Sequence, residues 1–175
     1  MPVPSIGDLV MKKILLSTVI ALSVCAPAYA ASGNSSTATG SATALVVAPI
    51  VLTHTSTASL NFGSFTTGTG GSVVVTSAGA GSVTGDVGLV PGSTNAADAF
   101  TVTGDNSRNF SIATTSGTIT NGASSMGFTT TPSAAAGTTT SSGTAAFTVG
   151  GTLTVGTGLA TGTYTGSYSA TVAYD

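Results

Sequence analysis

The chain has 175 residues, only 5% of them charged, and a formal net charge of −2. After residue 30, its charged side chains are four aspartates and one arginine, and this part has no cysteine, lysine, glutamate or tryptophan. With a single cation it has no basic stripe for nucleic acid, and without a thiol it forms no disulfide.

The N-terminal region has the pattern of a secretory signal peptide. Lys12 and Lys13 precede the apolar run 14–24, and the small-x-small box Ala28-Tyr29-Ala30 follows. Such a pattern ends at a cleavage site. We therefore treat residues 1–30 as an N-terminal extension and signal peptide. The residues before Met11 have no place in such a signal, so Met1 and Met11 both remain candidate starts.

The same region predicts where the protein goes. Cys25 follows Val24, whereas a lipid-attachment box has a small residue there, so we expect cleavage after Ala30 and no lipid. The longest later apolar run, 44–52, is too short to span a bilayer and contains a proline. We expect a secreted protein, in the periplasm in transit and then at the cell surface or outside, with no membrane span after cleavage.

Residues 31–48 form the N-terminal segment, and its part 31–43 is mostly Ser, Thr, Ala and Gly. From residue 37 to residue 46, small or apolar residues take the even positions, and polar residues take the odd ones as far as Thr43. The alternating pattern predicts either a strand with small side chains on one face or a loose tail. The even positions are Ala38, Gly40, Ala42, Ala44 and Val46, and the polar ones are Thr37, Thr39, Ser41 and Thr43.

Residues 49–175 read as one β-sandwich domain. Valine, isoleucine and aromatic residues supply its apolar positions, and turn signals come every eight to twelve residues or so, which is typical of an antiparallel sandwich. We expect the six phenylalanines in the core. The expected strands are 50–55, 60–65, 72–76, 83–90, 99–103, 109–114, 118–120, 126–130, 145–155 and a terminal strand.

Glycine-rich stretches predict how these strands are joined. Gly68-Thr69-Gly70-Gly71 and Gly104-Asp105-Asn106 are expected turns, the second a hairpin turn. Asn121-Gly122 is a candidate for the centre of a type I′ hairpin turn. The low-complexity stretch 133–143 is expected to be a surface loop.

The terminal strand has the clearest alternation in the chain. Its apolar or small positions are Tyr164, Gly166, Tyr168, Ala170, Val172 and Tyr174, with Ser or Thr at most positions between them. This pattern predicts one half-buried strand. Because nothing follows it in this chain, we expect its open side to pair with an earlier segment or with another molecule.

No constellation of residues indicates an enzyme, a cofactor or a metal. His54 is the single histidine and has no acid close in sequence, so we interpret it as a surface or strand residue. The chain has no Gly-x-Ser-x-Gly elbow, and after residue 30 no lysine for a P-loop. Asp105, Ser107 and Asn109 have calcium-loop spacing but lack the glycine and later acid of an EF-hand, so a turn explains them better.

Three short motifs carry a family resemblance. They are Leu60-Asn61-Phe62-Gly63, the run 147–153 (Phe-Thr-Val-Gly-Gly-Thr-Leu), and the Gly162-Thr163-Tyr164-Thr165-Gly166 segment that leads into 171–174. Over about residues 42–175 the chain resembles secreted bacterial proteins of domain of unknown function family 4402. More loosely it resembles the spore coat protein U domain, a pilin module of archaic chaperone–usher fimbriae.

The pilin resemblance implies an immunoglobulin-like antiparallel sandwich that lacks its last strand. A periplasmic chaperone, and then the N-terminal segment of the next subunit at an outer-membrane usher, would fill the groove by donor-strand addition.

We therefore expect a non-catalytic structural subunit of a bacterial cell-surface fibre or coat, a homopolymer joined through strand addition. Residues 31–48 are the candidate donor. A self-complete secreted monomer that binds a surface partner or glycan is the main alternative, and ice or mineral binding through Thr rows is a third. The expected assembly residues are Thr37, Ala38, Gly40, Ala42, Ala44, Val46, Tyr164, Tyr168, Val172 and Tyr174.

A first prediction concerns processing. The exported protein should begin at Ala31 and carry no lipid, because the cleavage box ends at Ala30 and Val24 spoils the lipid box. Intact mass spectrometry of the exported protein checks this. A protein that starts at Cys25 with added acyl mass would contradict it.

Overall fold

The computed structural model describes residue 33 and residues 35–175, so the predicted signal peptide lies outside the described residues. Residues 45–175 form one compact unit, separate from the residues that precede it. The unit contains eleven strands, and no helix of the described residues is long and apolar enough to cross a membrane. In the described part of the segment before Val51, no strand is present.

The strands form two antiparallel sheets, which confirms the all-β sandwich predicted from the alternation. The larger sheet curls, and its order is β1-β4-β9-β7-β6-β10, with β2 paired to β9 and β3 to β2. It contains β1 (Val51–His54), β2 (Phe65–Val75), β3 (Gly81–Leu89), β4 (Asp98–Thr103), β6 (Gly117–Asn121), β7 (Ser124–Pro132), β9 (Thr144–Val155) and β10 (Thr165–Ser167). The smaller sheet has the order β11-β5-β8 and contains β5 (Asn109–Thr114), β8 (Ala136–Thr138) and β11 (Ala170–Tyr174).

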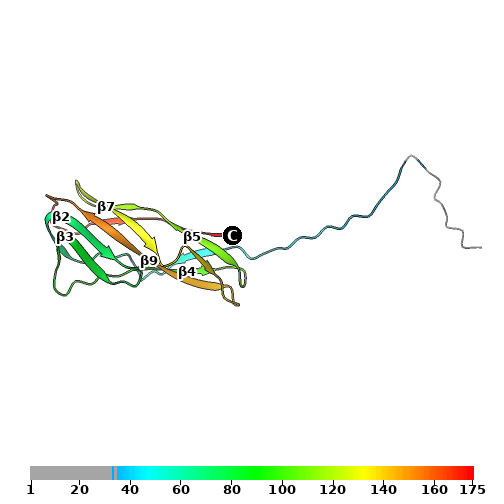
Figure 1. Cartoon of the computed structure of the whole chain (residues 1–175), viewed down its shortest axis with the longest axis horizontal. Helices are drawn as coiled ribbons and strands as arrows, with labels where there is room; N and C mark the ends of the chain where they lie inside the picture. The colour runs from blue at the N-terminus through cyan, green and yellow to red at the C-terminus, as the bar shows by residue number, and fades with distance from the viewer. Residues whose placement is uncertain (1–32, 34) are drawn as a thin grey trace, which may run out of the picture. The chain divides into compact units, whose positions relative to one another are not determined.

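The twelve-residue strand β9 runs through both halves of the unit, one half containing β4 and the other containing β2, as Figure 1 shows. Its first half pairs with β4 along 144–149, and its second half pairs with β2 along 151–155. On its other edge it pairs with β7 from Val149 to Leu153. One continuous strand therefore contributes inward side chains to both halves.

Two clusters of buried side chains make up the core, one in each half. The first cluster lies around β2, β7 and the second half of β9; the second lies between β4, β5 and the first half of β9. Tyr168 packs against both. Five of the six phenylalanines predicted for the core are buried, and Phe65 is partly buried. The buried residues of the first cluster are Phe62, Val73, Val75, Val87, Met126, Phe128, Leu153 and Val155. Those of the second cluster are Phe100, Val102, Phe110, Ile112, Phe147 and Val149.

Gly150 and Gly151 lie where β9 changes partner from β4 to β2. A Cβ on Gly150 would collide with the carbonyl oxygen of Val75, and one on Gly151 would lie 2.5 Å from the carbonyl oxygen of Thr129. Both collisions are with backbone, which cannot move aside as a flexible side chain can. The glycine pair in the 147–153 motif therefore allows the strands to approach closely at this point.

The terminal strand differs from the prediction. It is two short strands in different sheets: β10 pairs with β6, and β11 pairs with β5. The predicted alternation of side chains is nevertheless correct, because Tyr164 and Tyr168 pack on the first cluster while Val172 and Tyr174 pack on the second. Alternation reports which face of a strand is buried, and it does not report which sheet the strand joins.

Several predicted connections are also corrected. The expected strand 60–65 forms only an isolated bridge between Asn61 and Ala96 before β2 begins at Phe65. The expected turn at 68–71 is an irregularity within β2, where pairing to β3 shifts register. The expected loop 133–143 contains β8, which pairs with β5.

Two turn predictions placed the chain reversal correctly but not its geometry. Asn121 pairs with Ser124, so the central turn residues are Gly122, with φ +59°, and Ala123. Since Ser107 alone among the described non-glycine residues has a positive φ, this is the type II′ pattern rather than type I′. The turn at 104–106 joins β4 to β5, which lie in different sheets, and so is not a hairpin.

A second prediction tests the close approach in β9. Gly151→Ala should destabilise the fold by about 1–3 kcal/mol, because its new methyl group has no room. Gly127→Ala in β7 is the matched control, since that position is exposed, has an ordinary φ and meets no atom within 4 Å. It should change stability by no more than about 0.5 kcal/mol. Urea unfolding checks both, and equal effects of the two variants would contradict the proposed role.

Candidate functional site: a groove along the open side of the larger sheet

A groove of about 830 Å³ lies between β10 and the segment that leads into β2. Within the described residues, β10 pairs only with β6. The backbone of residues 59–64 is joined to residues 90–96, through the Asn61–Ala96 bridge and the hydrogen bond from Val90 N to the carbonyl of Ser64, and not to β10. The larger sheet is therefore left open along this line, which we call the seam groove. Its apolar lining includes Leu60, Phe62, Phe65, Ile119, Met126 and Leu159.

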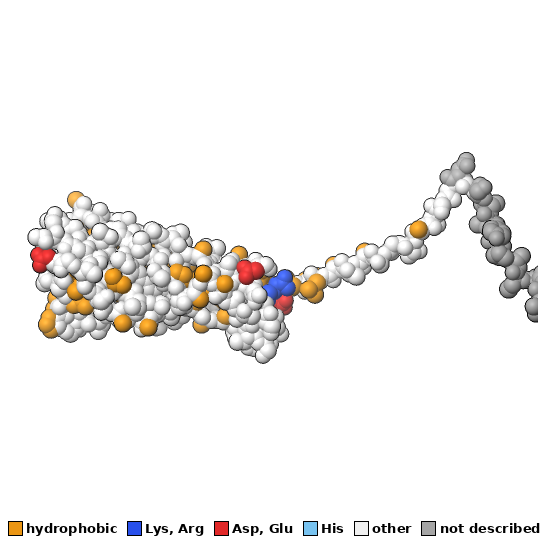
Figure 2. Space-filling model, viewed as in Figure 1, with side chains coloured by type: hydrophobic (Ala, Val, Ile, Leu, Met, Phe, Trp, Pro, Cys, Tyr) orange, Lys and Arg blue, Asp and Glu red, His pale blue; other side chains and the backbone are white. Residues whose placement is uncertain are grey.

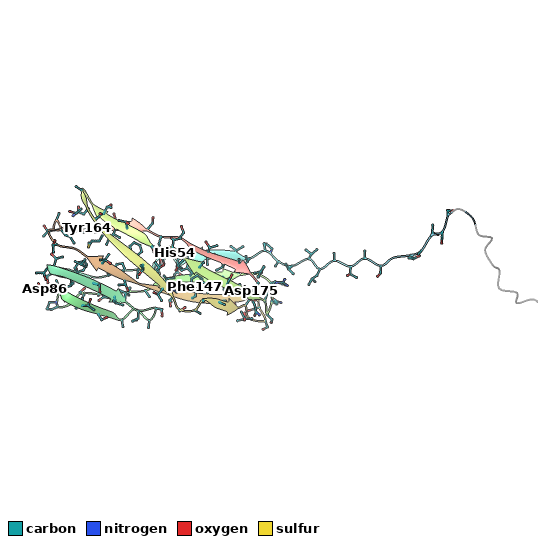
Figure 3. The ribbon with its side chains drawn as sticks, turned by 45° about the horizontal axis from the view of Figure 1, so that its top comes forward. His54, Asp86, Phe147, Tyr164 and Asp175 are labelled. Atoms are coloured by element: carbon teal, nitrogen blue, oxygen red, sulfur yellow. The ribbon has the colours of Figure 1, made fainter. Side chains whose placement is uncertain are left out.

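The seam groove has no charged lining residue among the described part of the chain. Figure 2 shows that on the visible face of residues 45–175 the charged side chains gather at the two ends. Figure 3 places the labelled Asp86 and Asp175 at these opposite ends. The groove thus offers an apolar floor and neutral polar rims to a partner.

The first rim is built by the Leu60-Asn61-Phe62-Gly63 motif. The Asn61 side chain accepts a hydrogen bond from Gly63 N at 2.8 Å, and Gly63 adopts φ +75°, a conformation that favours glycine. Phe62 enters the first core cluster, and its carbonyl accepts a hydrogen bond from Asn95 Nδ2 at 2.7 Å. The motif therefore fixes a tight bend whose aromatic side chain forms part of the groove floor.

The second rim is the segment 159–166, which includes the start of β10. Tyr164 packs on the first cluster while its hydroxyl donates to the carbonyl of Ala160 at 2.8 Å. Asn121 Nδ2 donates to the carbonyl of Thr161 at 3.3 Å. These contacts hold the rim in place beside the groove.

A smaller cavity of about 380 Å³ shares lining residues with the seam groove and contains a buried carboxylate. Asp98 is 5% exposed. Its Oδ2 accepts a hydrogen bond from the Tyr168 hydroxyl at 2.8 Å, and its Oδ1 contacts His54 Nε2 at 2.7 Å and Ala99 N at 2.9 Å. The carboxylate of β4 is thus satisfied by donors from β1, from its own strand and from the link between β10 and β11.

Sequence analysis missed the partner of His54. Asp98 is 44 residues away in the chain, and strand pairing brings the two together. One signal was available: Asp98 shares the inward face of β4 with Phe100 and Val102, and a carboxylate on such a face requires hydrogen-bond donors.

Burial raises the pKa of Tyr168 well above its ordinary range, and the hydrogen bond to Asp98 and the charge of that carboxylate raise it further. The ionised phenolate would lose hydration and face a like charge at the same time. The neutral hydroxyl is therefore the form that the fold stabilises.

The pair His54 and Asp98 has the arrangement of a base and its orienting acid, and Ser59 and Ser167 line the same cavity. In the described residues, His54 hydrogen-bonds to Asp98 and neither of these serines hydrogen-bonds to it. The described residues also contain no group of three potential metal ligands. The Asp105 carboxylate oxygen Oδ2 lies 3.8 Å from Arg108 Nη1, an ion pair between residues three apart in the chain. This contact is consistent with the interpretation of Asp105, Ser107 and Asn109 as part of a turn.

The predicted assembly residues fall into three groups. Tyr164 lines the seam groove, and Tyr168 lines the adjoining cavity. Val172 and Tyr174 lie apart from both; the Tyr174 hydroxyl accepts from Asp105 N at 2.6 Å and donates to the carbonyl of Ala48 at 3.0 Å. The third group lies in the N-terminal segment, whose described residues form no strand; its members are Thr37, Ala38, Gly40, Ala42, Ala44 and Val46. The side chain of Val46 is 92% exposed.

The fold and groove define an all-β domain of two antiparallel sheets with one open side. A family model described as Domain of unknown function (DUF4402) matches residues 52–174, which run from β1 to the last residue of β11. The chain belongs to this family, as the three motifs predicted. No curated protein and no solved structure matches the chain.

A third prediction concerns Tyr168. In the unfolded chain a tyrosine ionises near pH 10, whereas the raised pKa keeps Tyr168 protonated in the fold. This contribution to stability is complete below about pH 10 and is lost as the pH rises above that value. Unfolding measured from pH 8 to 11.5 should therefore show a steeper alkaline loss in the wild type than in Tyr168→Phe. Equal slopes in the two proteins would contradict the assignment.

Proposed function

We propose that the protein is a non-catalytic structural subunit of a bacterial cell-surface fibre or coat, and that its subunits join by β-strand addition. The observation that supports this proposal is the seam groove, an uncharged apolar channel between two chain segments that are not paired to each other. An edge strand presents backbone donors and acceptors that a further strand can use.

An extended segment fits such a groove better than a charged or compact ligand. Alternate residues of β10 direct backbone N–H and C=O groups away from β6, toward the seam groove. The floor below takes apolar side chains from every second residue of an inserted strand.

The occupant that we propose is residues 37–48 of a second copy. This segment is uncharged and alternates small apolar with polar residues, apart from the apolar Leu45 and Val47 on the polar side of the pattern. Ten of its residues in an extended conformation would span roughly 33 Å. Val46 is the largest side chain of the alternating set, so it should anchor the strand on the apolar floor.

The position of Ala48 favours insertion into another molecule. Its carbonyl is held by Tyr174, next to Asp175, whereas the seam groove is lined by Tyr164. Figure 3 shows Tyr164 and Asp175 toward opposite ends of the unit. If the donor segment starts at one end of the unit and the groove lies toward the other, each copy joins the next head to tail. Such contacts build an open chain of copies, whereas a self-complementary contact would stop at a pair.

The looser resemblance to spore coat U-type pilins supports the same proposal and suggests its route. A periplasmic chaperone would cover the seam groove before assembly, and an outer-membrane usher would exchange it for the next subunit. The signal-peptide pattern in residues 1–30 fits export to the compartment where this exchange takes place.

A fourth prediction tests the donor. Val46→Asp in the exported full-length protein should abolish the assemblies that the wild type forms, because it places a charge without a partner in an apolar channel. Thr43→Asp, on the opposite face of the segment, is the matched control and should still assemble. Size-exclusion chromatography with light scattering separates monomers from assemblies.

The Val46→Asp protein also allows a direct test of peptide binding, because Val46 does not line the seam groove and the substitution leaves the groove unchanged. A synthetic peptide of residues 35–48 should bind it with one-to-one stoichiometry and raise its melting temperature. The peptide that carries Val46→Asp should not bind. If the wild type is a monomer under all conditions and the peptide has no effect, the protein is a self-complete domain and the proposal is wrong.

A further inference from the structure

The segment that precedes β10 is held in place by side chains. Residues 159–163, which we call the strap, form part of the second rim of the seam groove, and Leu159 packs on the first core cluster. Within the described part of the chain, no backbone–backbone hydrogen bond involves the strap. The hydrogen bonds that reach it are Ala160 N to Ser124 Oγ at 3.3 Å, Asn121 Nδ2 to the Thr161 carbonyl at 3.3 Å, and the Tyr164 hydroxyl to the Ala160 carbonyl at 2.8 Å.

The strap nevertheless has the sequence pattern of a strand. From Ala160 to Ser167, small or apolar residues take the even positions, and threonine or serine takes the odd ones. This period of two is typical of a strand with one buried face. β10 takes up only the last three of the eight residues 160–167. The local sequence therefore favours a longer strand than the one that is present.

The strap has no partner strand because β6 ends too early. β6 runs from Gly117 to Asn121, and Thr165 lies opposite Thr120. In this register Tyr164 is opposite Asn121, and the residues before Tyr164 lie beyond the start of the hairpin turn to β7. β6 therefore offers no backbone to the strap, and a strand that enters the seam groove from another molecule can do so.

The proposed donor needs a longer acceptor than β10 provides. The three residues of β10 extend over roughly 10 Å, whereas ten residues of the donor span roughly 33 Å. The acceptor cannot be lengthened beyond Ser167, because the carbonyl of Ser169 accepts from Thr115 N at 2.9 Å and the chain then enters β11 in the smaller sheet. A strand of residues 160–167 would span roughly 26 Å.

We propose that residues 160–164 straighten and join β10 when a donor strand enters the seam groove. The donor then pairs with an acceptor strand of residues 160–167 rather than with β10 alone. Because the donor forms these backbone hydrogen bonds only with the straightened segment, its binding shifts the strap to that form. This inference rests on the proposed function, and it assigns residues 160–164 to the binding site as pairing partners rather than as a fixed rim.

Two features hold the strap in its unpaired form. The Tyr164 hydroxyl bonds to the carbonyl of Ala160, but in a strand the Cα atoms of these residues would lie roughly 13 Å apart, so this hydrogen bond must break. Gly162 has φ +140°, which residues with a side chain rarely adopt, whereas a strand has a negative φ that alanine adopts readily. Removal of either feature should favour the straightened form.

The test measures binding of the peptide of residues 35–48 to exported full-length protein that carries Val46→Asp, so that the peptide is the donor. Addition of Gly162→Ala or Tyr164→Phe should tighten binding by about threefold or more, because each raises the fraction of molecules with a straightened strap. Gly79→Ala, between β2 and β3, is the matched control, since Gly79 also has a positive φ, +84°, and does not line the groove. It should lower the melting temperature and leave the affinity unchanged.

Hydrogen exchange provides a second measurement. Peptide binding should add protection to amides within residues 160–164 and should leave those of β3, which does not line the groove, unchanged. If the peptide binds but neither variant binds more tightly, or if residues 160–164 gain no protection, the strap is a fixed rim; this inference is then wrong and the proposed function stands. If the peptide binds to none of the proteins, the proposed function fails and this inference fails with it.

Discussion

The buried carboxylate of Asp98 is the interaction on which the arrangement of the two sheets depends. A charge this deep is costly unless donors satisfy it, and here the donors come from three separate places in the chain. His54 belongs to β1, Ala99 continues β4, and Tyr168 lies where the chain leaves the larger sheet for the smaller one. The carboxylate therefore fixes the point where the terminal segment changes sheets, beside the cavity that adjoins the seam groove.

Strand β9 and its glycine pair connect this point to the half of the unit that contains the groove. The strand pairs with β4 in one half and with β2 in the other, so a single sheet runs through both halves. In the half with β2, the sheet curls around the first core cluster, and the Asn61–Phe62–Gly63 bend covers that cluster without pairing to β10. The open side of the sheet lies between this bend and β10.

The low charge of the chain has a consistent physical interpretation. Charged edge residues keep most sheet proteins apart, and here the described charges lie near the ends of the unit or, in Asp98, inside it. The rims of the seam groove are therefore neutral, and no charged side chain of the described residues lines it.

The sequence by itself determined the β class, the buried faces of the strands and the aromatic core, because these follow from composition and from a local period of two. It indicated the family through three short motifs. Only the tertiary structure decided the partners of those strands. The terminal alternation could not show that β10 and β11 join different sheets, and the lone His54 could not show that Asp98 lies against it. The contacts of Asp98 with His54 and Tyr168 span 44 and 70 residues, and such separations are set by how sheets close around a core rather than by any local pattern.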